Sequence, residues 1–471
     1  MNKYHINPNS GEVGQCWAQR GKCPFGEADR HYHSPAEARA AYEILQEDFY
    51  RGVKTYPKAI EFSKDVRKLL TVLEEQGLTP LIVGGSVRDA LATGITSKDV
   101  DIEVFGADSV EKLAAILKDC SYKVDDVGKS FGVLKSRLRD GTDLDISLPR
   151  RDSLVGEGHR GFEVEVDSQL SLADAASRRD FTINALYYSV SRGALLDAFG
   201  GVADWRNGIL RKTSEAFSED PLRVLRAAQF ASRFNLKVSQ DTVVASKEIA
   251  STFGSLSSER VQEEFGKLFS KGKNTTAALL FLHQSGWAKH FHLSPGKVDD
   301  QGEKVDRTLI MAGDRFPREV FGASALLRSV DLKHRSQVAQ LIVVGKKEQE
   351  KALALSMSQK PLAFSRSGIS RWARSLAENN ITVEQWCVAN EAYVESADVD
   401  KIQTVALEAQ CYRGLKPDLV TGKMILAKSS KPQGPWMGKL IHRARQSQDL
   451  EKFTTLENAQ AWLDRELSRL T

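Results

Sequence analysis

The hydrophobic periodicity of this 471-residue chain changes near Phe199. Residues 56–197 alternate short strand-like runs with helical ones, a pattern typical of an α/β or α+β domain. Beyond Phe199, helical patterns such as residues 221–234 and 257–270 follow one another with almost no strand signal. Because one hydrophobic core rarely grows past about 250–300 residues, the chain needs more than one domain. The sequence therefore predicts an α/β or α+β domain that precedes mostly helical segments.

Changes of pattern give expected domain boundaries near residues 55, 190 and 300. The first part is a small N-terminal extension of unknown role, an irregular segment closed by a helix that starts at Ser34 and Pro35. The best linker candidate is SPGKVDDQGEK, at residues 294–304. The four expected parts are the extension (1–55), the head (56–190) and two helical regions (191–300 and 301–471).

Composition excludes several classes of protein. Charged residues make up 27% of the chain and apolar residues 41%, as in folded globular proteins and unlike disordered or fibrous ones. No run approaches the roughly 18 consecutive apolar residues of a membrane helix, and residues 1–10 lack a signal-peptide core. The five cysteines are an odd, scattered set that suits a reducing compartment. We expect a cytoplasmic protein without membrane contact, whose net charge of +4 permits nucleic-acid binding without requiring it.

A glycine pair marks a sharp turn between a strand and a helix. Gly84 and Gly85 end the apolar run LIVGG (81–85) and precede SVRDALA. A helix that opens here presents unpaired backbone N–H groups, which attract anions such as phosphate. A plain strand-to-helix turn leaves the same pattern, so the glycines alone do not decide between the two.

Two aspartates lie two residues apart in the next predicted strand. Asp99 and Asp101 point to the same side of this strand, about 6.5–7 Å apart along it. The strand is half buried, because its alternate positions are the apolar Val100, Ile102 and Val104. Two acids on one face repel, and a cation such as Mg²⁺, which prefers carboxylates together with substrate phosphates, would hold them there. The alternative is a solvated strand edge with Asp99 capping a turn.

A third carboxylate can come from a β-hairpin. Residues 131–148 have the pattern of a hairpin that turns at Asp140 and Gly141, and Asp143 and Asp145 share a face of its second strand. Three carboxylates would hold two metal ions, one for the attacking hydroxyl and one for the pyrophosphate that leaves in a nucleotidyl transfer. The sequence offers no competing Ser-His or Cys-His arrangement, no GxxxxGK[ST] loop and no HExxH motif.

Ordered motifs extend this pattern along the chain. They are LIVGGSVRDAL with KDVDIEVFG, SRRDFTINAL (177–186), LLDAFGGVADWRNGILR (195–211), SEDPLRVLRAAQFASRF (218–234), ERVQEEFGKLF (259–269) and GKMILAKSSKPQGPWMGKLI (422–441). Together they resemble the class II tRNA nucleotidyltransferase and poly(A) polymerase family, the bacterial-type CCA-adding enzymes. The resemblance implies an α+β fold, in which a nucleotidyltransferase head of polymerase-beta-like fold has a small mixed β-sheet. It also implies a helical neck that selects the base, and a helical body and tail that bind tRNA.

The resemblance also implies roles for individual residues. Asp99 and Asp101 match the metal-binding catalytic acids, and Asp145 matches the third catalytic acid less surely. The matched nucleotide-binding residues are Gly84, Gly85 and Arg88 at the glycine turn, Arg178, Arg179, Asp180 and Asn184 for ribose and triphosphate, and Glu219, Asp220, Arg223 and Arg226 near the incoming base. Arginine supplies rigid N–H donors to phosphate oxygens, although an arginine pair on a helix surface is the plain alternative.

The chemistry of Asp220 and Arg223 supports a role in base selection. Three residues apart on a helix, they are neighbours at about 5–6 Å. A carboxylate accepts and a guanidinium donates, which suits the exocyclic amine and unprotonated ring nitrogen of cytosine and adenine. Guanine and uracil present the reverse order, so they would leave buried polar groups unpaired. The alternative is local, because Asp220 before Pro221 is also a good helix N-cap.

Two further groups of residues invite a binding role. Cys16, Cys23, His31 and His33 are residue types that suit tetrahedral zinc, but no tight CxxC pair is present, so packed or exposed small residues remain the alternative. A basic run around residues 434–436 could grip RNA phosphates or be a solvated helix face. Its members are Lys428, Lys431, Lys439, Arg443 and Arg445.

The sequence thus predicts a template-independent, Mg²⁺-dependent nucleotidyltransferase that uses CTP and ATP to build the CCA end of tRNA. A poly(A) polymerase, or an enzyme that adds only CC or only A, would share these motifs. An RNA-binding adaptor that has lost its chemistry and a nucleotidyltransferase acting on small molecules or proteins are alternatives of other classes. The intact acids Asp99 and Asp101 argue against the adaptor. The C-terminal stretch that resembles a tRNA-binding tail argues against an enzyme that acts on small molecules or proteins.

Overall fold

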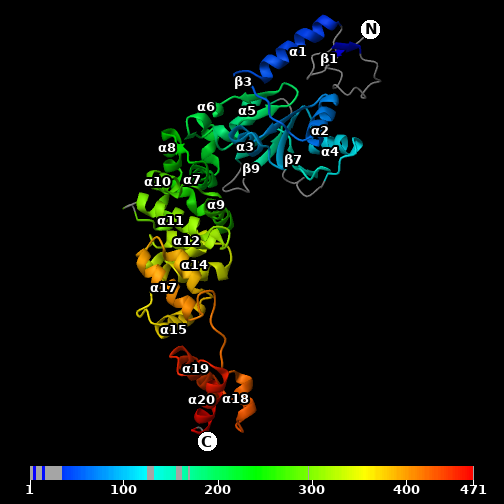
Figure 1. Ribbon diagram of the computed structural model, residues 1–471. Helices are drawn as coiled ribbons and strands as arrows, with labels where there is room; N and C mark the ends of the chain where they lie inside the picture. The colour runs from blue at the N-terminus through cyan, green and yellow to red at the C-terminus, as the bar shows by residue number, and fades with distance from the viewer. Residues whose placement is uncertain are drawn as a thin grey trace. The chain divides into compact units, whose positions relative to one another are not determined.

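The structure is a computed structural model that describes residues 4–6, 13–15, 34–124, 132–154, 162–167, 170–294, 296 and 298–469 (Figure 1). Its residues group into two compact units. Unit 1 is Met1–Ala227 with Asn235–Leu256, and unit 2 is Ala228–Phe234 with Ser257–Thr471. No helix among the described residues is long and apolar enough to cross a membrane.

Unit 1 is built around a mixed sheet of seven strands in the order β3-β11-β10-β4-β5-β7-β6. Only β5 and β7 pair in parallel, while every other neighbouring pair is antiparallel. The predicted hairpin is confirmed as β6 and β7, joined by a turn at Asp140 and Gly141. The strands are β3 (Lys54–Pro57), β4 (Thr79–Val83), β5 (Asp99–Phe105), β6 (Val133–Arg137), β7 (Asp143–Ser147), β10 (Tyr187–Ser189) and β11 (Ala194–Asp197).

Each face of this sheet has its own hydrophobic core, because the strands alternate apolar side chains between the two faces. On one face Ile102 and its neighbours pack against α2 (Lys64–Glu75) and α4 (Val110–Asp119). On the other, Val83 and Tyr187 pack against the short helix α5 (Leu172–Ser177). The carboxylates of β5 lie on this second face, so α5 and the residues that follow it come close to them.

Shorter elements complete the first unit. They are β1 (Tyr4–Ile6), β2 (Val13–Gln15), α1 (Pro35–Phe49), α3 (Gly85–Thr93), β8 (Arg150–Leu154), β9 (Phe162–Val166), the 3₁₀ turns at Thr182–Asn184, Glu215–Glu219 and Ala250–Ser255, α6 (Gly201–Arg206), β12 (Ile209–Leu210), the first part of α7 (Leu222–Phe234), β13 (Lys237–Val238) and α8 (Gln240–Glu248). The helix expected from Ser34 and Pro35 is present as α1. The antiparallel pairs β1–β2 and β8–β9 were not predicted from the sequence.

Unit 2 consists of the last part of α7, from Ala228 to Phe234, and the helices from α9 onward. They are α9 (Ser258–Lys271), α10 (Thr275–Gln284), a 3₁₀ turn (Trp287–Phe291), α11 (Val298–Ala312), α12 (Arg318–Leu327), α13 (Leu332–Ile342), α14 (Lys346–Met357), α15 (Arg366–Ala377), α16 (Val383–Asn390), α17 (Ser396–Glu408), α18 (Gly422–Lys428), α19 (Pro435–Asp449) and α20 (Leu456–Ser468). The predicted change from mixed to helical structure after Phe199 is therefore confirmed in the described residues.

The predicted linker at residues 294–304 is wrong over most of its length, because α11 begins at Val298. Gly302 explains the error. A Cβ atom at this position would lie 2.2 Å from the hydroxyl oxygen of Thr276 on α10, so the glycine permits a close approach of two helices. The expected domain boundaries near 55, 190 and 300 stay predictions, although β11 carries the sheet beyond residue 190.

Candidate active site

The glycine turn lies directly beside the first acid-bearing strand. Gly84 has φ +74° and ψ −135°, a conformation that is accessible mainly to glycine. A Cβ atom there would lie 3.2 Å from Oδ2 of Asp101 and 3.7 Å from Nη1 of Arg179. Gly85 opens α3, whose first-turn amides have no acceptor within the helix. The turn therefore brings backbone N–H donors, a carboxylate and a guanidinium to one place.

The paired strands β5 and β7 bring acids together across the sheet. Asp99 lies opposite Asp143 and Asp101 lies opposite Asp145, in a parallel register that puts both pairs on one face. Asp101 stays accessible to solvent, yet partial burial raises the pKa of its carboxyl. The Arg179 guanidinium lowers this pKa, while the charges of Asp145 and Asp99 raise it further.

The donor set fits a divalent cation that takes oxygen ligands. Among the described residues, no three histidine, cysteine, aspartate or glutamate side chains gather closely enough to hold one ion by themselves. Magnesium needs no such cage, because it is usually bound by one or two carboxylates with water and substrate phosphates. Asp99 and Asp101 meet that requirement. Asp145 pairs with Lys135 at 3.1 Å, so its role as the third acid stays a prediction.

Glu103 is a third acid on the same face of β5, and the sequence analysis missed it. Its side chain is fully buried, and it accepts hydrogen bonds from Arg178 at 2.7 Å, Arg179 at 3.2 Å and the hydroxyl of Tyr187 at 2.5 Å. Burial alone would raise the pKa of Glu103, but Arg179 and Arg178 hold it below its ordinary value. The period-two spacing of residues 99, 101 and 103 was the signal that could have found it.

Side chains of the motif at residues 177–186 form a chain of buried hydrogen bonds with α3 and α7. Arg88 donates to Asn184 at 2.6 Å, Asn184 donates to Asp180 at 3.0 Å, and Arg226 donates to Asp180 at 2.8 Å. Burial would raise the pKa of Asp180, but Arg226 and Asn184 keep it below its ordinary value. Arg88 is almost fully buried and also contacts Asp89, so its structural role is visible whereas its contact with phosphate stays a prediction.

The candidate base-selecting residues lie at the start of α7. Asp220 accepts from the backbone N–H of Leu222 at 3.1 Å, so the capping role weighed as its alternative is present. Arg223 donates to the carbonyl oxygens of Ala216 and Arg178, and burial lowers its pKa. Glu219 is exposed at the end of the preceding 3₁₀ turn. These two carbonyl oxygens thus fix the orientation of the Arg223 guanidinium.

The motif at residues 195–211 holds the motif at residues 177–186 in place. Asp197 is buried and accepts from the backbone N–H groups of Gly201 at 2.9 Å and Val202 at 3.0 Å, which caps α6. Thr182 donates to Asp204 at 2.8 Å, so α6 also holds the turn that carries Asn184. This motif therefore has a structural explanation that requires no contact with substrate.

We expect Gly201→Ala to lower the free energy of unfolding by about 3 kcal/mol, the upper part of the usual range for overpacking. The added Cβ would lie 2.2 Å from the carbonyl oxygen of Thr182, and backbone atoms cannot turn aside as a side chain can. Urea denaturation would measure the loss. Gly254→Ala is the matched control, because a Cβ at Gly254 meets nothing within 4 Å. Equal stability of the two variants would contradict the close approach.

The predicted basic run in the C-terminal part is largely paired. Lys428 bonds to Asp464 at 2.7 Å, Arg445 to Asp418 at 2.8 Å, and Arg443 to Glu466. The other two members, Lys431 and Lys439, are exposed. Lys439 has no ion-pair partner among the described residues. The zinc candidates Cys16, Cys23, His31 and His33 lie outside the described residues.

Comparison with known proteins agrees with this arrangement. Residues 81–211 match the family model of the poly A polymerase head domain. A Multifunctional CCA protein from Xylella fastidiosa is 38% identical over 205 residues, which cover 43% of this chain and 46% of that protein. One from Nitrosococcus oceani is 43% identical over 162 residues, which cover 34% and 37%. The match thus spans less than half of these curated relatives.

Solved structures match over more of the chain. The Bacillus stearothermophilus CCA-adding enzyme in complex with CTP has a TM-score of 0.65 at 23% identity, covering 86% of this chain and 98% of that one. The Thermotoga maritima CCA-adding enzyme complexed with tRNA has a TM-score of 0.58 at 19% identity, covering 91% and 98%. The predicted α+β fold class is confirmed. Residues 81–211 therefore match the poly A polymerase head domain, and the chain shares the fold of the solved CCA-adding enzymes.

Proposed function

We propose that this protein is a template-independent nucleotidyltransferase that adds C and A from CTP and ATP to the 3′ end of tRNA. The observation that carries the proposal is the placement of Asp101 beside the Gly84 turn and Arg179. A carboxylate for a cation, backbone donors and a guanidinium for phosphate thus meet at one point of the head. The curated relatives and the solved neighbours, named for CCA addition, support the same activity. The activity implies a cytoplasmic enzyme.

The chemistry is a displacement at phosphorus. The 3′ oxygen of the RNA forms a bond to the α-phosphorus of the nucleotide, and the bond from that phosphorus to the oxygen bridging to the β-phosphate breaks, which releases pyrophosphate. When bound at Asp99 and Asp101, Mg²⁺ supplies activation of the attacking hydroxyl and charge compensation for the leaving group. The protein contributes no covalent nucleophile, so its residues act by binding and orientation.

The residues divide this work between them. Arg179 and the amides of Gly84 and Gly85 would hold the triphosphate, since rigid guanidinium and backbone donors suit phosphate oxygens. Asp220 and Arg223 would select the base by accepting from the exocyclic amine and donating to the ring nitrogen of cytosine or adenine. The buried chain from Arg88 to Arg226 supports both halves of this site.

Poly(A) synthesis is the second candidate, because the matching family model describes a poly A polymerase head. Purified protein should be offered tRNAs that end before, within and after the CCA triplet, with each labelled nucleotide in turn. Sequencing of the products then distinguishes full CCA addition from CC-only, A-only and poly(A) addition. No incorporation of any nucleotide would leave the RNA-binding adaptor and a nucleotidyltransferase of small molecules or proteins as the remaining functions.

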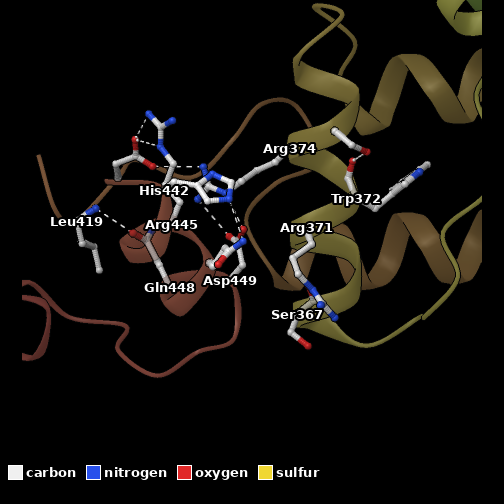
Figure 2. Close-up of polar contacts among 12 residues, drawn as sticks. Ser367, Arg371, Trp372, Arg374, Leu419, His442, Arg445, Gln448 and Asp449 are labelled. Atoms are coloured by element: carbon white, nitrogen blue, oxygen red, sulfur yellow. Dashed lines mark hydrogen bonds and ion pairs between the residues drawn. The ribbon is translucent and has the colours of Figure 1, made fainter. Parts of the chain in front are cut away.

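In unit 2, helices α18–α20, here named the tail, are the proposed contact with the tRNA body. The tail has its own hydrophobic core and is joined to α15 by charged side chains (Figure 2). Arg374 donates to both carboxylate oxygens of the buried Asp449, at 2.6 and 3.1 Å, and to Asp418 at 3.3 Å. Arg445 of α19 bonds to the same Asp418 at 2.9 Å. These ion pairs, here named the joint, hold the tail against α15.

We expect Arg374→Met to weaken tRNA binding about tenfold while leaving CTP binding unchanged. The change leaves the buried Asp449 carboxylate without its cation, so the joint loses its fixed geometry. Filter binding with tRNA and calorimetry with CTP would measure the two affinities. Arg371→Met is the matched control on the same helix, because Arg371 is exposed and contacts only the carbonyl of Ser367 among the described residues (Figure 2). An equal loss in both variants would refute a special role for the joint.

A further inference from the structure

Glu103 occupies an unusual position for a carboxylate. It lies on β5 two residues beyond Asp101, on the same face of the strand, yet its side chain is fully buried. Its opposite neighbour on β4 is the apolar Leu81. A buried carboxylate is costly unless it is paired and hydrogen-bonded, so its partners are essential to its presence.

Those partners are two consecutive arginines and one tyrosine. One carboxylate oxygen accepts from Nη2 of Arg178 at 2.7 Å. The other accepts from Nη2 of Arg179 at 3.2 Å and from the hydroxyl of Tyr187 at 2.5 Å. The ring of Tyr187 also lies 5.3 Å from the Arg179 guanidinium. Glu103 and Tyr187 therefore restrain the position of the Arg179 guanidinium.

The restrained guanidinium keeps donors for another partner. Nε of Arg179 is buried without a hydrogen-bond partner among the described residues. Its Nη1 lies 3.7 Å from the position that a Cβ atom would take at Gly84. Buried donors are almost always satisfied in folded proteins, so an orphan Nε on a guanidinium whose Nη1 reaches the glycine turn indicates an acceptor that binds there. Phosphate oxygens have the chemistry of that acceptor.

A second connection leads from Arg178 toward the base. The carbonyl oxygen of Arg178 accepts from Nη2 of Arg223 at 2.7 Å. Glu103 holds the Arg178 side chain, while the Arg178 backbone holds the candidate base-selecting arginine. The carboxylate is thus connected to both ends of the proposed nucleotide site.

We propose that Glu103 is a positioning residue, which fixes Arg178 and Arg179 so that the triphosphate of the incoming nucleotide binds in register with Asp101. This inference rests on the proposed nucleotidyltransferase function and goes further by naming the group that holds the phosphate-binding arginines. The charge of Glu103 also cancels one of the two adjacent positive charges. One net positive charge then remains beside the cation site.

The test compares Glu103→Gln with Glu111→Gln. At position 103 the glutamine keeps the shape of the side chain but turns an amide N–H₂ toward a donor, so it cannot accept from both arginines. We expect KM for CTP and ATP to rise 10- to 100-fold, kcat to fall less, and KM for tRNA to stay within threefold of the wild type. Glu111→Gln makes the same exchange at an exposed position in the first turn of α4. Its KM values should all stay within threefold.

The outcomes separate positioning from a purely structural role. Wild-type KM for nucleotides in folded Glu103→Gln would overturn the proposal, as would equal changes in the KM values for nucleotide and tRNA. If Glu103→Gln does not fold, Glu103→Asp takes its place. Aspartate keeps the charge but is one methylene shorter, so KM for CTP should rise more than threefold, and no rise would overturn the proposal.

Calorimetry with CTP and Mg²⁺ in the absence of tRNA distinguishes this inference from the proposed function. A wild type that binds CTP but incorporates nothing would end the transferase proposal. The loss of CTP affinity in Glu103→Gln would still support the positioning role. A wild type that binds neither CTP nor ATP would overturn both.

Discussion

Asp101→Ala should abolish incorporation of every nucleotide, by at least about 10³-fold, because the reaction then loses a carboxylate that holds the cation. Asp101 lies opposite Asp145 in the sheet, and its Oδ2 lies 3.2 Å from the position that a Cβ atom would take at Gly84. Glu103, the next acid on this face of β5, cannot replace it, since Glu103 is engaged by two arginines. Incorporation of labelled CTP and ATP into tRNA under single-turnover conditions would measure the loss.

Two measurements make this first prediction specific. Binding of tRNA should survive with a Kd within threefold of the wild type, because the tail and the other helices of unit 2 are unchanged. Asp108→Ala is the control for loss of one negative charge, since Asp108 is exposed and pairs with Lys112 at the start of α4. Unchanged incorporation in Asp101→Ala would remove the assignment of the cation site.

Replacing Asp220 by Asn and Arg223 by Met should relax selection against GTP and UTP by about 100-fold, the order that a hydrogen-bonding site loses when its polar pairing is removed. In the wild type Asp220 accepts a hydrogen bond and Arg223 donates one, which matches cytosine and adenine. An asparagine at position 220 can also donate to the carbonyl group of guanine or uracil. Asparagine can still cap Leu222 through its side-chain oxygen, so α7 keeps its start. Competition between all four nucleotides on one tRNA would measure the change.

The Arg223 change needs its own control, because this arginine also satisfies two backbone carbonyls. Thermal unfolding of each single variant separates lost stability from lost selectivity. Glu215→Gln removes an exposed charge from the preceding 3₁₀ turn and should leave selectivity intact. Full retention of C and A selectivity in the double variant would refute the side-chain template.

The sequence was sufficient to predict features that depend on local periodicity. The alternation of Val100, Ile102 and Val104 with acids predicted the half-buried strand β5, and the Asp140-Gly141 turn predicted the hairpin. Both follow from geometry within a few residues. The grouping of the motifs around Gly84 followed from the family resemblance rather than from spacing.

Features that depend on tertiary packing were beyond the sequence. Glu103 has the same spacing as Asp99 and Asp101, but only the cover provided by α5 and Tyr187 turns it from a surface acid into a buried one. The residues around 294–304 contain glycine, proline and aspartate and so indicated a linker, yet Gly302 serves a close helix contact. The basic run of the tail indicated free positive charge, whereas the fold pairs three of its five members with acids.

Strand β5 also limits how this head can change in evolution. The acid expected to hold the cation and the acid that holds the arginines are separated by a single residue, so an extended backbone sets their separation at about 6.5–7 Å. One residue inserted between them would turn every following side chain to the opposite face. Descendants of such a gene should therefore accept no length change between Asp99 and Glu103.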